Sequence, residues 1–246
     1  MMDSQREYRR FSHKGANFRI CCGRFEAVTR EIVRQRELLE AYIESHAEFA
    51  TSLEPVPARG EAPDVAKRMA RAAATVGVGP MAAVAGTFAQ LAAEAGLAAG
   101  ADEAVVENGG DMFLICRRRA VIGLFAGEGP LSDRLALEIS PELTPLAICS
   151  SSGRMGHSLS LGDCDLATVT SPDAALADAA ATLAANLVRS EADVDDALAR
   201  IAAIEGIRGV LIVQGGRVGL AGRLPPLAAN RDAELTRKVT RDRRSK

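Results

Sequence analysis

The chain has 246 residues, 48% of them hydrophobic and 25% charged, a composition that suits a folded domain with a sizeable core and excludes a disordered chain. Its formal net charge is −2, which gives no general attraction to nucleic acid. Trp is absent and aromatic residues make up only 4%, so Ala, Val, Leu and Ile must fill the core.

Cysteine content and the chain ends bear on the compartment. The five cysteines are odd in number and include no C-x-x-C pair, which argues against a disulfide framework and a zinc site. The charged N-terminal segment lacks the apolar core of a signal peptide, and no apolar run approaches a membrane span in length, so we expect a cytoplasmic protein with no membrane partner. Residues 231–246, with seven basic and three acidic side chains, predict a flexible, solvated tail; a nucleic-acid or membrane-surface role is the alternative.

The N-terminal half alternates between strand and helix signals. Residues 9–22 predict a first strand, and the apolar spacing over residues 25–46 predicts an amphipathic helix. A loop over 51–62 precedes a helix from Pro63 to about Val76. After the break at residues 77–80, a nearly uncharged helix over 81–95, with Gly86 inside it, is expected to be buried against a sheet.

The rest of the chain groups its strands before and after further helices. Strands are predicted over residues 103–107, 112–116, 120–125, 146–149, 158–161 and 166–170. Helices are predicted over 171–189 and 194–204, followed by a hairpin of residues 210–213 and 217–220. Strands that run in groups favour an α+β fold in a single domain, and two rounds of helices plus antiparallel strands suggest an internal duplication.

Asn108-Gly109-Gly110-Asp111 is the first of three polar clusters in apolar sequence. Asn-Gly and Gly-Gly are favoured in tight hairpin turns, so a purely structural turn is one interpretation. The other is that the glycine backbone approaches a ligand, to which the Asp111 carboxylate is hydrogen-bonded.

Ser150-Ser151-Ser152-Gly153 follows an apolar strand and leads on to His157. One interpretation is a flexible serine loop; the other is an anion-binding nest for phosphate, with His157 in proton transfer. The segment from Gly156 to Ser160 is not a hydrolase nucleophile elbow, because its last glycine is missing and the following residues predict strand where the elbow needs a helix.

Asp178 and Thr182 are four residues apart on a predicted helix and therefore share a face. They are either an ordinary solvated pair or oxygen ligands for a hard cation such as Mg²⁺. The surrounding alanines argue for close packing, and a polar pair in a close-packed setting needs partners.

The segment Ala177-Asp178-Ala179-Ala180-Ala181-Thr182 resembles the A-D-x-x-x-T metal motif of the ApbE-like superfamily, the FAD:protein FMN transferases. Residues 108–111 resemble the superfamily's N-x-G-G-D segment. The chain is most similar to an uncharacterised prokaryotic branch of that superfamily, through Gly77-Val78-Gly79-Pro80-Met81 to Gly86 and through residues 151–160. The resemblance implies a fold of two intertwined repeats of helices packed on antiparallel sheets.

The resemblance also implies a site. Asp178 and Thr182 would bind Mg²⁺; Asn108, Gly109, Gly110, Asp111 and the segment Ser150, Ser151, Ser152, Gly153 would bind FAD or another nucleotide; His157 would be catalytic. The chain departs from the transferases after His157, where Ser158-Leu159-Ser160 replaces Asp-Pro-x-x-Gly.

Two functions follow as expectations. The first is an enzyme that transfers FMN to a hydroxyl of a protein or small-molecule acceptor, and the second is a non-catalytic flavin or nucleotide carrier or sensor. The oligomeric state, a homo-oligomer included, is left open.

Overall fold

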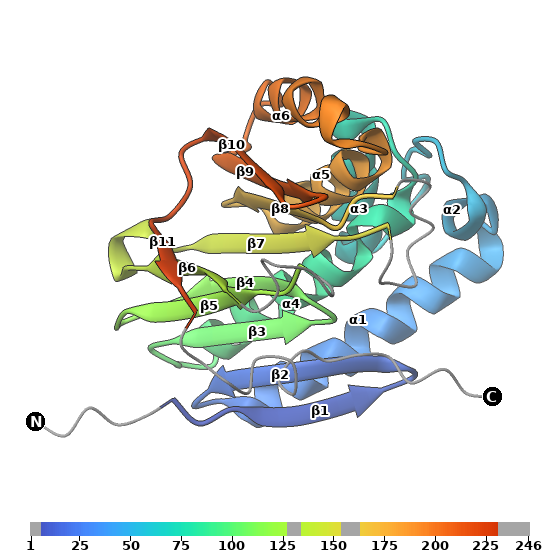
Figure 1. The fold of residues 1–246 in the computed structure, drawn as a ribbon. Helices are drawn as coiled ribbons and strands as arrows, with labels where there is room; N and C mark the ends of the chain where they lie inside the picture. The colour runs from blue at the N-terminus through green and yellow to red at the C-terminus, as the bar shows by residue number, and fades with distance from the viewer. Residues whose placement is uncertain (1–5, 127–133, 154–162, 231–246) are drawn as a thin grey trace, which may run out of the picture.

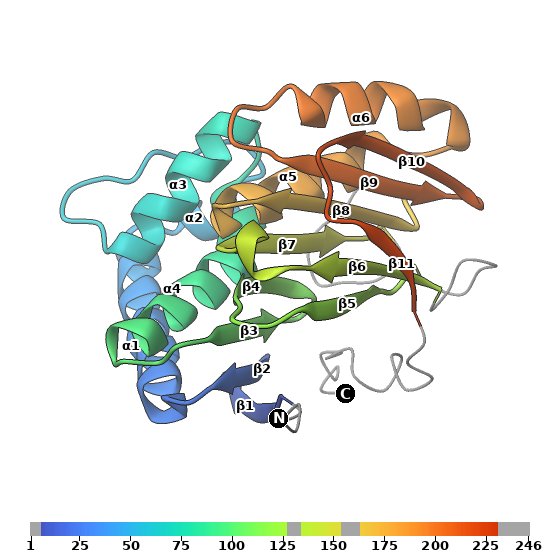
Figure 2. The same ribbon diagram turned by 90° about the vertical axis from the view of Figure 1, so that its left-hand side faces the viewer.

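The computed structural model describes residues 6–126, 134–153 and 163–230. The predicted strand over 158–161, the tail from residue 231 and His157 lie outside these residues. The architecture has three layers: helices, a large antiparallel sheet and a small antiparallel sheet (Figures 1 and 2).

Eight antiparallel strands form the large sheet, in the order β1-β2-β3-β4-β7-β8-β9-β10. Their bounds are β1 Arg9–His13, β2 Ala16–Cys22, β3 Ala104–Asn108, β4 Asp111–Ile115, β7 Leu146–Ser151, β8 Leu166–Ser171, β9 Gly209–Gln214 and β10 Arg217–Gly222. The small sheet, in the order β11-β6-β5, contains β5 Ala120–Leu124, β6 Leu135–Ile139 and β11 Leu227–Ala229. Antiparallel sheets with helices confirm the predicted α+β class.

The helices cover one face of the large sheet (Figure 2). They are α1 Phe25–Ser45, α2 Glu48–Thr51, α3 Asp64–Val76, α4 Val84–Ala98, α5 Ala174–Leu187 and α6 Val194–Ala202, with short 3-10 turns η1 Pro80–Ala83, η2 Pro141–Leu143 and η3 Glu191–Asp193. One core fills the space between the helices and the sheet, and a second core fills the space between the two sheets.

Local sequence explains the helix ends. The buried side of α1 carries Val28, Ile32 and Leu39, which recur at helical spacing. α3 ends at Gly77, whose φ of +84° places it in the left-handed region that glycine adopts without strain. α5 begins after Asp173, whose side chain accepts a hydrogen bond from the Leu176 N–H at 3.2 Å.

Each half of the large sheet repeats one pattern: a hairpin, then helices, then a second hairpin. In the first half β1-β2 precede α1–α4 and β3-β4 follow; in the second half β7-β8 precede α5 and α6, and β9-β10 follow. The halves meet where β4 pairs with β7, and α3 and α4 pack on α5 across that junction. This arrangement agrees with the expected duplication.

Three details differ from the sequence-based expectations. The predicted strand over 9–22 is a hairpin, because the chain turns at Lys14 and Gly15, which both have positive φ. The expectation that no apolar run approaches a membrane span is wrong for Pro80–Ala98, whose 19 residues are long and apolar enough by length and composition. Half of that stretch is buried inside the fold, which agrees with the prediction of a buried core helix. β6 and β11 were not predicted.

Candidate functional site

The Asn108–Asp111 segment is the tight hairpin between β3 and β4. Gly109 and Gly110 have φ values of +64° and +108°, and Asn108 pairs with Asp111 across the turn. The segment is therefore a tight hairpin turn, and Gly110 in particular needs glycine, because its φ lies beyond the left-handed region that Asn adopts. A Cβ at either glycine would have no atom within 4 Å, so open space lies beside this turn.

Strand register aligns the polar residues of the turn with a buried thiol. Asn108 pairs with Phe18 on β2 and with Asp111 on β4. Because Met112 pairs with Ile148, the next step in the antiparallel register places Asp111 opposite Cys149 on β7. Asn108, Asp111 and Cys149 are all buried. The Asp111 carboxylate accepts a hydrogen bond from the Ser150 N–H at 3.1 Å, and the Cys149 thiol donates to the Ala174 carbonyl at 3.6 Å.

The first turn of α4 is held from two directions. The Asp178 carboxylate on α5 accepts a hydrogen bond from the Gly86 N–H at 2.9 Å, and the Asn108 side-chain amide donates to the Ala85 carbonyl at 3.2 Å. A Cβ at Gly86 would lie 2.3 Å from the Ala174 carbonyl oxygen, so only glycine allows α4 to approach α5 this closely. The turn of residues 108–111 and helix α5 thus converge on one end of α4.

Burial and neighbouring negative charges shift the pKa values of the acidic side chains at this point. Burial, with a contribution from Glu107, raises the pKa of the Asp111 carboxyl to about 7. Burial and the Asp111 charge raise the pKa of Asp178 well above its usual range, against the opposing effect of the Gly86 and Ala85 N–H groups. Burial and both carboxylates likewise raise the pKa of the Cys149 thiol well above 9. The raised pKa values mean that these two carboxyl groups favour a bound proton, or a cation nearby, over the free carboxylate form.

Thr182 lies one helical turn beyond Asp178 on α5, and both side chains are buried. The oxygen donors of Asp111, Asp178 and Thr182 are of the kind that Mg²⁺ prefers, and Mg²⁺ commonly takes one or two carboxylates and completes its shell with water and substrate phosphates. Within the described ranges, no group of three His, Cys, Asp or Glu side chains could hold a metal ion. These side chains are of a chemical class that Mg²⁺ accepts, and any Mg²⁺ bound here would take part of its shell from water or a ligand.

The serine segment differs from the expected loop. Ser150 and Ser151 continue β7 and pair with Thr168 and Ala167 on β8. Across this pairing, the Ser150 hydroxyl is also hydrogen-bonded to the Thr168 hydroxyl at 2.9 Å. Of the four predicted residues, only Ser152 and Gly153 lie beyond the strand. The Ser152 hydroxyl and the Gly153 N–H both donate hydrogen bonds to the Cys164 carbonyl. Of the predicted ligand-binding residues in this segment, Ser150 lies next to Asp111 through its N–H.

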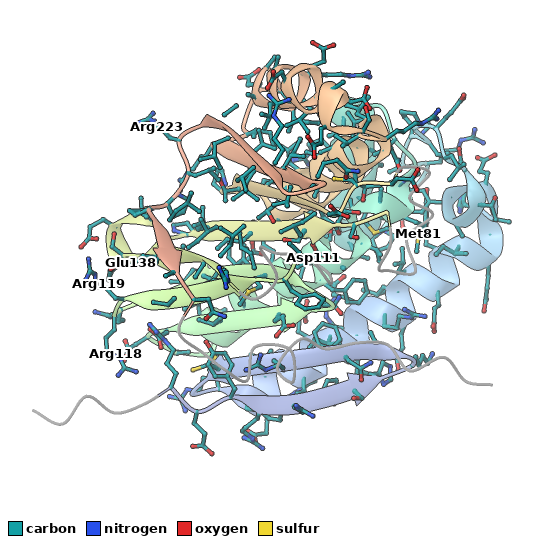
Figure 3. All side chains as sticks on the ribbon, viewed as in Figure 1. Met81, Asp111, Arg118, Arg119, Glu138 and Arg223 are labelled. Atoms are coloured by element: carbon teal, nitrogen blue, oxygen red, sulfur yellow. The ribbon has the colours of Figure 1, made fainter. Side chains whose placement is uncertain are left out.

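Sequence reasoning placed Asn108, Asp111 and Asp178 in the site but missed Gly86 and Cys149 as their neighbours. The available signal for Gly86 was a glycine inside an otherwise apolar helix, which is expected where another backbone comes close. Cys149 gave no such signal, because a buried cysteine at a strand end is most often a small hydrophobic residue. In Figure 3, Arg118, Arg119 and Glu138 lie at one end of the molecule, Asp111 lies near its middle, and Met81 lies nearer the other end.

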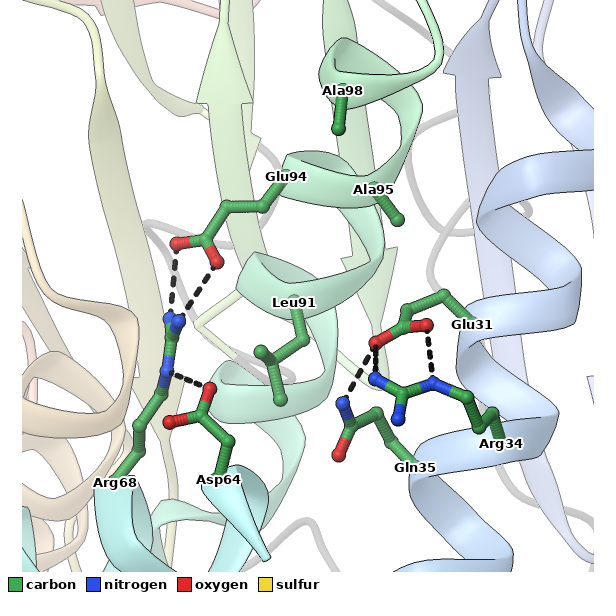
Figure 4. A pocket seen from close by; sticks show the side chains of 9 residues that line it. All are labelled: Glu31, Arg34, Gln35, Asp64, Arg68, Leu91, Glu94, Ala95 and Ala98. Atoms are coloured by element: carbon green, nitrogen blue, oxygen red, sulfur yellow. Dashed lines mark hydrogen bonds and ion pairs between the residues drawn. The ribbon is translucent and has the colours of Figure 1, made fainter.

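A hollow of about 320 Å³ lies elsewhere, between α1, α3 and the C-terminal half of α4 (Figure 4). Its walls are ion pairs: Arg68 to Glu94 and to Asp64, each at 2.9 Å, and Arg34 to Glu31 at 2.6 Å. These pairs satisfy one another and carry no residue of the three polar clusters. We assign the hollow to helix packing.

Comparison with known proteins places this site in context. A family model described as AbpE bacteria matches residues 7–219. A UPF0280 protein from Methanosarcina acetivorans is 41% identical over 203 residues, which cover 82% of this chain and 80% of the relative. A UPF0280 protein from Methanocella arvoryzae is 44% identical over 196 residues, which cover 80% of each chain.

Two solved structures share the fold. The apo form of Pseudomonas stutzeri flavinyl transferase ApbE superposes with a TM-score of 0.55 at 12% identity, covering 90% of this chain and 96% of that one. The ApbE protein of Thermotoga maritima gives a TM-score of 0.56 at 13% identity, covering 87% and 96%. At these identities the likeness shows the fold alone, and it confirms the ApbE-like architecture.

Proposed function

The chain belongs to the family described as AbpE bacteria, and from that premise we propose that it binds FAD or a related nucleotide together with Mg²⁺. The observation that carries the proposal is the buried pair Asp111 and Asp178, whose pKa values are both raised by burial and by neighbouring negative charge. A divalent cation would relieve the repulsion that a proton relieves otherwise.

The β3–β4 turn supplies the second half of the proposed site. Gly109 and Gly110 present backbone without side chains to open space, which is how a chain admits a bulky anionic group such as a pyrophosphate. Asp178 and Thr182 would bind Mg²⁺, and Asn108 and Ser150 would fix the surrounding elements. A bound Mg²⁺ would supply charge neutralisation at the phosphates.

For the reaction, we propose transfer of FMN from FAD to a hydroxyl acceptor, a protein or a small molecule. The hydroxyl oxygen would form a bond to the FMN phosphorus, the pyrophosphate P–O bond would break, and AMP would leave with the electron pair. The hydroxyl proton would pass to a base, a role that the sequence assigns to His157. The fold shared with flavin transferases supports this reaction. The proposed place of the reaction is the cytoplasm.

One sequence feature favours a second candidate, a carrier or sensor that binds flavin without turnover. The Asp-Pro-x-x-Gly stretch that follows the histidine in the transferases is replaced by Ser158-Leu159-Ser160. Such a protein would use the same Asp111 and Asp178 pair for Mg²⁺ and nucleotide.

The purified protein, incubated with FAD and Mg²⁺, separates the candidates. An enzyme yields protein-bound FMN or free FMN and AMP, whereas a carrier binds FAD unchanged. The variant Asp178→Asn should lose binding in both cases, and Asp196→Asn, at an exposed position of α6, is the matched control. If FAD, ADP and FMN all leave the melting temperature of the wild type unchanged, the proposed function is wrong.

A further inference from the structure

Helices α4 and α5 each supply a side chain to the first turn of the other. The Asp178 carboxylate on α5 accepts a hydrogen bond from the Gly86 N–H, in the first turn of α4, at 2.9 Å. In return, the Gln90 side-chain oxygen on α4 accepts a hydrogen bond from the N–H of Ala174, the first residue of α5, at 2.8 Å. An N–H in the first turn of a helix has no partner inside that helix. Each helix therefore caps the other.

The residues that precede the two helices do not supply these partners. Ala83 precedes α4, and its methyl side chain cannot accept a hydrogen bond. Asp173 precedes α5, and its side chain accepts from the Leu176 N–H, whereas the Ala174 N–H donates to Gln90. Ala174 is fully buried, so loss of the Gln90 oxygen would leave a buried N–H without its partner.

The two contacts lie one helical turn apart on both helices. Gly86 and Gln90 are four residues apart on α4, and Ala174 and Asp178 are four residues apart on α5, so each pair lies on one face of its helix. A single contact would let α5 rotate about one point, whereas two contacts about 6 Å apart along each axis fix its rotation and its height against α4. The position of the Asp178 carboxylate therefore depends on Gln90 as well as on Gly86.

A chain of hydrogen bonds holds the Gln90 side chain in the orientation that this contact requires. Its amide nitrogen donates to the Glu94 carboxylate at 2.9 Å. Glu94 also accepts two hydrogen bonds from Arg68, each at 2.9 Å, and Arg68 donates to Asp64 as well (Figure 4). An ionised Glu94 can only accept and the Ala174 N–H can only donate, so the amide nitrogen of Gln90 must face Glu94 and its oxygen must face α5.

We propose that Gln90 is a positioning residue for the candidate site: through Ala174 it holds α5 where the Asp178 carboxylate can bind Mg²⁺. The inference rests on the proposed function, because it assumes that Asp178 is a metal ligand. Residues that orient a metal ligand without touching the metal commonly account for a large part of the metal affinity. Gln90 has this relation to Asp178, because it acts on the helix that carries the ligand.

The Mg²⁺ concentration that gives half-maximal FAD binding tests the proposal. Gln90→Met keeps the size of the side chain but removes both hydrogen bonds, so it should raise this concentration by at least about tenfold. The melting temperature should fall by only about 2–4 °C, the usual effect of one lost hydrogen bond in a chain of this length. Hydrogen exchange at the Gly86 amide should become faster, because Asp178 would be held less firmly against it.

An exchange of two side chains provides the rescue. The double variant Gln90→Glu with Glu94→Gln keeps the total charge, places a carboxylate oxygen against the Ala174 N–H and restores a donor at position 94. It should return the Mg²⁺ concentration for half-maximal FAD binding to near the wild-type value. If Gln90→Met does not fold, Gln90→Asn carries the same prediction, because its side chain is one methylene too short for the contact.

Ser190→Ala is the control for lost stability alone, because it removes the side-chain cap of η3, beyond the other end of α5. An unchanged Mg²⁺ requirement in Gln90→Met would overturn the inference and leave the proposed function intact. An equal shift in Ser190→Ala, or no recovery in the exchange variant, would also overturn it, because the position of Asp178 would then not explain the effect. FAD binding to the wild type that does not depend on Mg²⁺ would instead overturn the proposed function.

Discussion

The Asp178 carboxylate and the Gly86 N–H form a 2.9 Å hydrogen bond that joins α5 to the first turn of α4. The bond connects the two halves of the fold, because α4 belongs to the first round of strands and helices and α5 to the second. It also fixes one of the two carboxylates of the candidate site. Stability and ligand binding therefore depend on the same contact.

Gly86→Ala is expected to lower the free energy of unfolding by about 1–3 kcal/mol, the usual range for overpacking. The added Cβ would lie 2.3 Å from the Ala174 carbonyl oxygen and 2.9 Å from the Asp178 Cβ, and backbone cannot move aside easily. This loss outweighs the gain of about 0.5–1 kcal/mol that Ala gives over Gly within a helix. Urea denaturation measures the change.

Gly23→Ala is the matched control, because a Cβ there has no atom within 4 Å and its φ is not positive. It should change stability by less than about 0.5 kcal/mol. Equal stability of Gly86→Ala and wild type would show that α4 and α5 are not as close as described.

The helices were predictable because their signals are local. The apolar spacing of residues 25–46 and the Gly77 break gave α1 and α3 almost to the residue. β1 and β2 were joined in the prediction because alternation continues through Lys14-Gly15, and only the positive φ of both residues makes the turn. β11 has only three residues after two prolines, too short for a periodic signal.

The site was predictable only in part, because it depends on register and helix contact. Asp111 and Asp178 were identified by motif, yet their partners Gly86 and Cys149 come together only through the α4–α5 approach and the β4–β7 pairing. The serine segment was taken for a loop because serine runs usually are loops, whereas pairing of Ser150 with Thr168 extends the strand.

Stability of the metal-free protein should fall as the pH rises from about 4 to about 7. Burial raises the pKa of Asp111 to about 7 in the folded state, above the unfolded value of about 3.9. In that interval the folded state holds a proton on Asp111 that the unfolded chain has released. The stabilisation that this proton gives is therefore fully present below about pH 4 and lost above about pH 7. The expected fall is on the order of 2–4 kcal/mol in the free energy of unfolding.

Asp111→Asn tests this assignment, because the amide cannot ionise and so should show a smaller fall over the same pH range. Urea titrations at pH 4, 5, 6 and 7 in the presence of a chelator give the comparison. Equal falls in stability for the wild type and Asp111→Asn, or a wild-type stability that rises over this range, would contradict the raised pKa of Asp111.

Gly110→Ala should destabilise the β3–β4 turn by about 1–2 kcal/mol, the cost of placing a side chain in a positive-φ conformation. The φ of Gly110 is +108°, outside the region that Asn tolerates, whereas the φ of Gly109 is +64°. Gly109→Asn is therefore the milder control. A thermal melt that ranks the two variants in the reverse order would disprove the turn geometry.

Thr182→Val should reduce the Mg²⁺ dependence of nucleotide binding several-fold, because it removes one proposed oxygen ligand while keeping the shape of the side chain. Thr29→Val on α1, away from the site, is the control. Nucleotide affinities with and without Mg²⁺ measure the effect, and an unchanged ratio would remove Thr182 from the proposed metal site.

Calorimetric titration of FAD into the metal-free protein, with and without added Mg²⁺, tests the central claim most directly. We predict that Mg²⁺ tightens FAD binding by at least about tenfold, equivalent to about 1.4 kcal/mol, and that Asp178→Asn abolishes this gain. Equal FAD affinity with and without Mg²⁺ in the wild type, or a full Mg²⁺ gain in the variant, would contradict it.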